Sequence, residues 1–217
     1  MARPTNIKMY YGNMAFWRAE CVRMGLFLGD IPFEDIRDQK RIDLKAAGKL
    51  TFGAIPVLEV DGKILSQTQA MASYVGKLAG IQPGDPWLDA KVDECINGCT
   101  DVTNTIGMTF RLPAEEKIAA RKALIADGGR LHMHLSGLEK ICAENVECAY
   151  AVWDSITVAD LAIWRLVGWL SSGVVDGIPV NFVESTFPAL SKLVATVDAD
   201  SKVNEWKAKY PDLYGGK

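Results

Sequence analysis

The first third of the chain alternates short β-prone runs with helical periodicity. Residues 7–11 are a β-prone run that ends at the turn pair Gly12-Asn13. Apolar positions recur at helical spacing over 16–28, and 33–37 predicts a second strand. The polar stretch that follows, through Lys49, predicts a loop with a short helix.

A hairpin and a helix follow. The runs 57–60 and 63–65 flank Asp61-Gly62, the favoured sequence of a two-residue hairpin turn. Ser66-Gln67-Thr68 predicts a cap for a helix that ends at Gly80. A crossover helix favours parallel pairing of the first two strands, and a tight hairpin forces antiparallel pairing of the last two. The expected result is a mixed four-stranded sheet.

Beyond the linker at 81–86, every strong period is helical. Thr157–Asp160 reads as a capping box that opens a buried apolar helix. We therefore expect an α/β domain over 1–82 and an all-α domain over 83–217. The helices are expected near 87–110, 114–127, 129–143, 157–171 and 188–208.

Composition and charge narrow the classes of function. The 217 residues carry 24 Lys and Arg against 27 Asp and Glu, a net charge of −3, which argues against a nucleic-acid partner. No run of eighteen apolar residues predicts a membrane span, and the N-terminus lacks the apolar stretch of a secretory signal. We expect a cytoplasmic protein with no membrane partner.

The five cysteines are scattered and odd in number, which indicates free thiols. Cys95 and Cys99 could share a helix face, but two histidines are too few to favour a zinc site, so we expect no metal. No Cys-x-x-Cys pair exists, so a dithiol oxidoreductase is not favoured.

The order of these elements and several local strings together resemble the cytosolic glutathione transferases, most of all the tyrosine-type, sigma-like class. The strings that carry the resemblance are Lys8-Met9-Tyr10-Tyr11, Arg18-Ala19-Glu20, Gly53 through Gly62, Gln67-Thr68, Val92-Asp93 with Asp101, and Thr157–Asp160. The resemblance implies a thioredoxin-like first domain that binds glutathione and a helical domain that lines the electrophile site. The implied reaction is conjugation of the glutathione thiolate to small, mostly apolar electrophiles. A glutathione-dependent isomerase or peroxidase, or a non-catalytic binding or structural protein of this fold, stays open.

The resemblance implies a tyrosine that stabilises the thiolate, with an arginine beside it. Tyr10 and Tyr11 are adjacent, so on a strand they face opposite sides of the sheet. Anchoring the comparison at Lys8-Met9 selects Tyr11 and places one extra residue in the loop before Arg18.

The other implied roles are assigned residue by residue. A cis Ile55-Pro56 bond would present backbone groups to the cysteinyl part of glutathione, and the start of a helix would hold the γ-glutamyl carboxylate. Asp101 would reach the glutathione of a second subunit, which implies a homodimer. The implied glutathione-binding residues are Lys45, Lys49, Ala54, Ile55, Pro56, Gln67, Thr68 and Asp101, and those of the electrophile site are Phe16, Trp17 and Met108. The tryptophan usual before the Ile-Pro turn has no match, and Lys45 and Lys49 are alternatives for the lysine that would hold the glycyl carboxylate.

Overall fold

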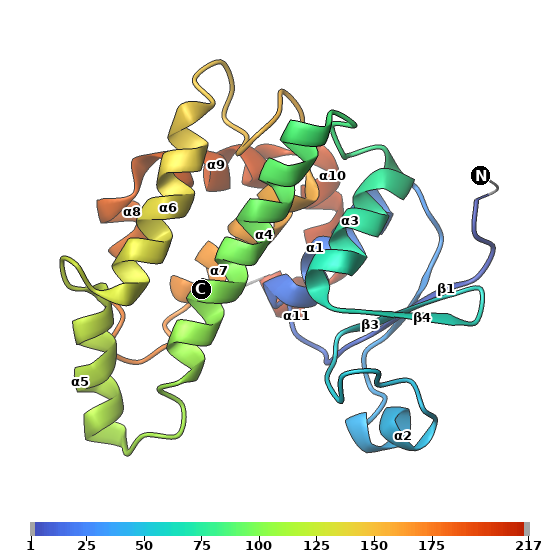
Figure 1. Cartoon of the computed structure of the whole chain (residues 1–217), viewed down its shortest axis with the longest axis horizontal. Coiled ribbons are helices and arrows are strands. Elements are labelled where there is room, and N and C mark those ends of the chain that lie inside the picture. The colour runs from blue at the N-terminus through green and yellow to red at the C-terminus, as the bar shows by residue number, and fades with distance from the viewer. Residues whose placement is uncertain (1–2, 215–217) are drawn as a thin grey trace.

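A computed structural model describes residues 3–214 (Figure 1). Those residues form one four-stranded sheet of order β2-β1-β3-β4, in which β1 pairs parallel with β2 and antiparallel with β3. β3 and β4 form the antiparallel hairpin. The strands are β1 Ile7–Tyr10, β2 Glu34–Ile36, β3 Val57–Val60 and β4 Lys63–Ser66. The mixed sheet expected from the sequence is confirmed.

Helices cover the two faces of the sheet unequally. α1 and α3 lie over one face and the short α2 over the other (Figure 1). On β1, Ile7 and Met9 face the main core, whereas Tyr10 belongs to a small second cluster with Leu44 and Val57. The bounds are α1 Trp17–Leu28, α2 Arg41–Ala46 and α3 Thr68–Ala79.

Beyond β4, every regular element among the residues up to 214 is a helix, as expected. The bounds are α4 Pro86–Gly107, α5 Ala114–Ile125, α6 Arg130–Glu144, α7 Val158–Leu170, α8 Phe182–Thr186, α9 Pro188–Ala199, α10 Ser201–Lys209 and α11 Pro211–Tyr214. The single helix expected over 188–208 is wrong: Asp200 has an extended ψ of 132° and caps a new helix by accepting the Val203 amide proton at 3.0 Å. Within residues 3–214, no helix is both long and apolar enough to cross a membrane.

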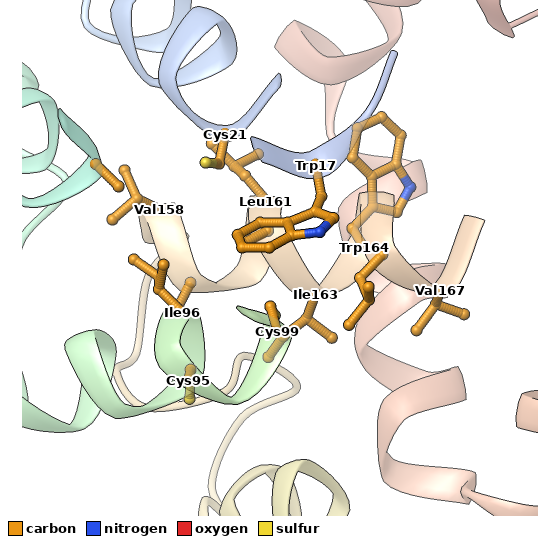
Figure 2. Packing of buried hydrophobic residues seen from close by; sticks show 14 of the residues in the cluster. Trp17, Cys21, Cys95, Ile96, Cys99, Val158, Leu161, Ile163, Trp164 and Val167 are labelled. Carbon is orange, nitrogen blue, oxygen red and sulfur yellow. The ribbon is translucent and has the colours of Figure 1, made fainter. Parts of the chain in front are cut away.

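α7 is the buried centre of the molecule. It packs against α1 on one side and α4 on another, and the apolar side chains that meet there include Trp17, Leu161, Ile96 and Cys99 (Figure 2). One continuous core therefore joins the sheet domain to the helical domain.

The start of α7 confirms the predicted capping box. Asp160 is fully buried and accepts hydrogen bonds of 2.7 Å from the Ala151 amide, the Thr157 amide and the Thr157 hydroxyl. Burial raises the pKa of Asp160, and these donated bonds oppose the rise. The carboxyl thus satisfies donors that water does not reach.

We predict that Asp160→Ala lowers the free energy of unfolding by about 3 kcal/mol, because buried donors left without an acceptor cost about 1–3 kcal/mol. The melting temperature should fall by roughly 6–12 °C in a chain of this size. Asp160→Asn, which keeps one acceptor oxygen, should lose less. Calorimetry measures both, and an unchanged melting temperature in Asp160→Ala would contradict the structural role.

Candidate functional site

The candidate site lies where three neighbouring strands end. Tyr10 pairs with Val57 across β1 and β3, and Val57 pairs with Ser66 across β3 and β4. Tyr11 follows β1, Pro56 precedes β3 and Gln67 follows β4. These three residues therefore lie at the same edge of the sheet. Hydrogen bonding of the sheet thus gathers residues from three separate segments.

Tyr10 and Tyr11 face opposite sides of the sheet, as expected from strand geometry. The Tyr10 hydroxyl donates to Glu59 Oε2 at 3.0 Å and accepts from Lys49 Nζ at 2.7 Å, on the α2 face. Tyr11 is half-buried against the main core, with the Arg23 guanidinium 5.8 Å from its ring centre. Tyr11 is therefore the tyrosine on the side of α1 and α3.

Two arginines set the electrostatics of Tyr11. Burial raises the pKa of the Tyr11 phenol, and the positive charges of Arg18 and Arg23 pull that pKa back. Burial in turn lowers the pKa of Arg18, which Tyr11 opposes. At neutral pH Tyr11 is thus a protonated hydroxyl that can donate a hydrogen bond.

Arg18 and Thr68 tie α1 to its neighbours. Arg18 Nη2 donates to Asn104 Oδ1 on α4 at 3.3 Å, and its guanidinium lies 5.2 Å from the Trp17 ring centre. The Thr68 hydroxyl donates to the Arg18 carbonyl at 3.2 Å. Tyr11, Arg18 and Thr68 therefore belong to one connected group.

The start of α3 differs from the sequence expectation. Gln67 is the N-cap residue but makes no side-chain cap, and its φ of 73° is in the region that non-glycine residues rarely adopt. Such backbone strain is concentrated at functional sites. The buried Ser66 hydroxyl, which can donate a hydrogen bond, has no hydrogen-bond partner among residues 3–214. Together with the unpaired amides of the first helical turn, this hydroxyl suits a polar, anionic ligand group.

The segment before β3 carries three of the candidate residues. Ala54 is exposed, Ile55 half-buried and Pro56 buried. The Ile55-Pro56 peptide bond is cis, as the resemblance implied. Arg41, which sequence analysis did not single out, donates from Nε to the Gly53 carbonyl at 2.9 Å and so holds this segment to α2.

Two of the proposed site residues have other partners in the structure. Trp17 is 0% exposed, and its indole Nε1 donates to Thr103 Oγ1 at 2.7 Å, so its ring belongs to the core and lines no binding surface. Lys49 forms a 2.7 Å ion pair with Glu59 on the face away from Tyr11, so its charge is already neutralised there. The alternative, Lys45, is exposed on α2.

The remaining candidates lie on the helical side. Phe16 is half-buried and packs edge-on against Trp169 with ring centres 5.2 Å apart. Met108 is 65% exposed at the end of α4. Asp101 is exposed on α4 and lines a groove of about 750 Å³ between α4 and α6.

Cysteine is not a candidate nucleophile at this edge. Cys21, one turn into α1, is fully buried, and burial raises the pKa of its thiol to about 12. A thiol with so high a pKa holds almost no thiolate at neutral pH.

Sequence analysis missed two arginines that hold the loop after Tyr11. The fully buried Arg23 donates from Nη2 to the Gly12 carbonyl at 3.3 Å and from Nη1 to the Met14 carbonyl at 3.1 Å. Arg165 of α7 donates from Nε to the Ala15 carbonyl at 3.0 Å. The only sequence signal for either is a cation within an apolar helical stretch.

Comparison with known proteins decides the family. A model of the glutathione S-transferase C-terminal domain matches residues 100–210. Glutathione S-transferase 1 of Ascaris suum is 30% identical over 200 residues, which cover 88% of this chain and 91% of the relative. The chain belongs to the glutathione S-transferase family.

Two further likenesses agree with this membership. A glutathione S-transferase of Anopheles gambiae is 26% identical over 94% of this chain and 96% of its own length. The crystal structure of the Ascaris lumbricoides glutathione S-transferase superposes with a TM-score of 0.75 at 28% identity, covering 95% of this chain and 98% of that one. The predicted glutathione S-transferase fold is therefore confirmed over nearly the whole chain.

We predict that the Tyr11 phenol ionises above pH 10, the value of an exposed tyrosine. The difference in phenolate absorbance between the wild type and Tyr11→Phe during an alkaline titration isolates this group. Because the folded-state pKa is raised above the unfolded one, the unfolded chain loses the proton first, and this group lowers stability as the pH rises through about 10. A difference signal that titrates well below pH 10 would mean that the arginine charges outweigh burial.

Proposed function

We propose that this chain is a glutathione transferase in which the Tyr11 hydroxyl donates a hydrogen bond to the thiolate of bound glutathione. The observation that carries the proposal is the position of Tyr11, a protonated donor beside Arg18 at the strand edge that also holds Pro56 and Gln67. Glutathione enters as a co-substrate.

The energy required is within reach of this arrangement. A free thiol has a pKa near 8.5, and lowering it to about 6.5 takes roughly 2.7 kcal/mol of preferential thiolate stabilisation. A hydrogen bond to a charged group is worth about 1.5–3 kcal/mol. Tyr11 can therefore supply most of the shift, with the positive charge of Arg18 adding to it.

The rest of glutathione fits the same edge. The γ-glutamyl carboxylate would accept from the first-turn amides of α3, oriented by Gln67; the Thr68 hydroxyl is already bonded to Arg18. Ala54 and Ile55 would pair through their backbone with the cysteinyl part, and Lys45 is the remaining lysine for the glycyl carboxylate.

In the reaction, the thiolate sulfur attacks an electrophilic carbon and a carbon–sulfur bond forms. The leaving group departs with the bonding electron pair, or, in an addition, the adjacent carbon takes a proton from solvent. Phe16 and Met108 would offer apolar contacts to the electrophile, since Trp17 is buried. The Tyr11 hydroxyl stabilises the sulfur as an anion until the carbon–sulfur bond forms, and it need not itself ionise.

We predict that Tyr11→Phe raises the pKa of the bound thiol by about 1–2 units, the loss of one charge-assisted hydrogen bond. Turnover with an aryl halide at neutral pH should fall accordingly, while glutathione affinity measured by calorimetry changes little. Thiolate absorbance of the glutathione complex, followed against pH, gives the thiol pKa directly.

Tyr10→Phe is the matched control, because it removes the same hydroxyl from the opposite face of the sheet. It should leave the thiol pKa in place. If Tyr10→Phe shifts the thiol instead, the assignment is wrong by one residue; if neither variant shifts it, Arg18 is the next group to test. Retention on immobilised glutathione without turnover of any electrophile would support a binding protein instead.

We also propose that the protein is a homodimer whose sites are completed across the interface by Asp101. The groove beside Asp101 carries both signs of charge, with Lys91 and Lys140 next to Glu94 and Glu144, so it can complement a second copy of itself. Apolar side chains stand exposed on both domains, with Phe52 on one and Met133 on the other. A second chain would cover this surface and place a carboxylate near the glutathione α-ammonium.

Sedimentation at micromolar concentration should give a dimer, and Asp101→Asn should raise the KM for glutathione several-fold with a smaller change in kcat, because a binding charge is lost rather than a reacting group. Asp89→Asn, elsewhere on α4, is the control. A monomer with full activity would overturn both the assembly and the role of Asp101.

A further inference from the structure

The C-terminal segment bonds directly to a buried carboxylate of α1. Glu20 is 0% exposed, and its Oε1 accepts from Trp206 Nε1 at 2.7 Å and from the Tyr214 hydroxyl. Its other oxygen, Oε2, accepts from Arg23 Nη1 at 3.2 Å. Residues nearly two hundred positions apart thus meet on one side chain.

Arg23 carries this contact to the loop after β1. The same guanidinium that pairs with Glu20 donates to the carbonyls of Gly12 and Met14, and it faces the Tyr11 ring. Its Nε donates to Asp35 at 2.9 Å, which fixes its direction. The orientation of Arg23 therefore depends on carboxylates at both ends of the guanidinium.

A second route joins Tyr214 to the same loop. The Tyr214 ring stacks on Trp164 with centres 5.9 Å apart and planes at 9°, and the Arg165 guanidinium lies 5.0 Å from its centre. Arg165 is the residue that donates to the Ala15 carbonyl. Both arginines that hold the loop 12–15 are thus linked to Tyr214. Arg23 is linked through Glu20, and Arg165 contacts the Tyr214 ring directly.

We propose that Tyr214 is a positioning residue for catalysis: by bonding Glu20 and packing on Arg165, it fixes the loop 12–15 and so the aim of the Tyr11 hydroxyl. This inference rests on the proposed role of Tyr11 and adds a dependence of that role on the C-terminal segment. The Tyr214 hydroxyl is the group that the role requires, because packing of the ring alone would leave Glu20 without one of its hydrogen bonds. Trp206 of α10 also donates to the Tyr214 hydroxyl at 3.2 Å, but α10 keeps the Trp206 bond to Glu20 and the Lys202 pair with Asp30 when that hydroxyl is lost.

The test compares Tyr214→Phe, which deletes one oxygen, with Tyr150→Phe, the same change in the loop before α7. A chain ending at Tyr210, which removes α11 altogether, is the stronger variant. Three measurements are made on the wild type and on each variant: hydrogen exchange of a peptide spanning 11–16, the pKa of the bound glutathione thiol, and kcat and KM with an aryl halide.

In Tyr214→Phe we expect faster exchange over 11–16, a higher thiol pKa and a kcat lower by about threefold to tenfold, the size of one lost hydrogen bond. The KM for glutathione should change by less than about twofold, because the glutathione-binding residues at 54–68 are untouched. The chain ending at Tyr210 should change further in the same direction, and Tyr150→Phe should match the wild type.

A lower melting temperature with unchanged exchange over 11–16, thiol pKa and kcat would show a purely structural role and overturn the inference. Hydrogen exchange over 11–16 reports whether Tyr214 fixes the loop even if the enzyme shows no turnover. If the wild type does not acidify the glutathione thiol, the proposed function falls. If exchange over 11–16 is also unchanged in Tyr214→Phe, the positioning role falls with it. If exchange over 11–16 is faster in Tyr214→Phe, the C-terminal segment still controls the position of the Tyr11 hydroxyl.

Discussion

The contact between α1 and α7 is the constraint on which the rest of this structure depends. α7 is buried along nearly its whole length, so water cannot hydrogen-bond to the amides at its start. The capping box of Thr157 and Asp160 provides acceptors there instead. α1 packs on this fixed helix through Trp17 and its neighbours (Figure 2). Because α1 begins directly after the loop that follows Tyr11, the position of α7 determines where Arg18 and Phe16 stand relative to the sheet. The helical domain thereby shapes a site whose polar groups come mostly from the other domain.

The sheet supplies the second requirement, which is convergence. Tyr11, Pro56 and Gln67 are far apart in sequence but share one edge, since the register of β1, β3 and β4 aligns their ends. A slip of one residue on β1 would turn Tyr10 toward α1 and α3 and Tyr11 toward α2. The Tyr10 hydroxyl would then lose its hydrogen bonds with Lys49 and Glu59. Pairing of Tyr10 on the α2 side thus stabilises the register that leaves Tyr11 available.

The elements with strong local signals could be predicted from the sequence. Which of two similar neighbouring side chains is buried or paired, and which stays available to a ligand, could not. Asp61-Gly62, the capping box at Thr157 and the helical periods beyond residue 86 are signals of this kind. Nothing local distinguishes Phe16 from Trp17, yet only Trp17 is enclosed by α4 and α7. Lys49 looks like a free cation until β3 places Glu59 beside it, and the end of α9 at Asp200 depends on a cap that helical periodicity conceals. The roles of Arg23 and Arg165 depend on backbone carbonyls, which carry no sequence signal at all.

Those carbonyls explain why ionised side chains are kept in the core. Replacing a buried ion pair by apolar groups is often neutral or stabilising, because removing two charges from water costs more than their attraction returns. Glu20 and Arg23 differ from a simple pair, since Arg23 also satisfies the carbonyls of Gly12 and Met14. The loop after β1 forms neither helix nor strand, so its polar backbone groups need side-chain partners where they are shielded from solvent. An apolar substitute for the pair would pack well and still leave the loop unheld. The charges are therefore better understood as the means by which an irregular segment is given one conformation beside the hydroxyl that it positions.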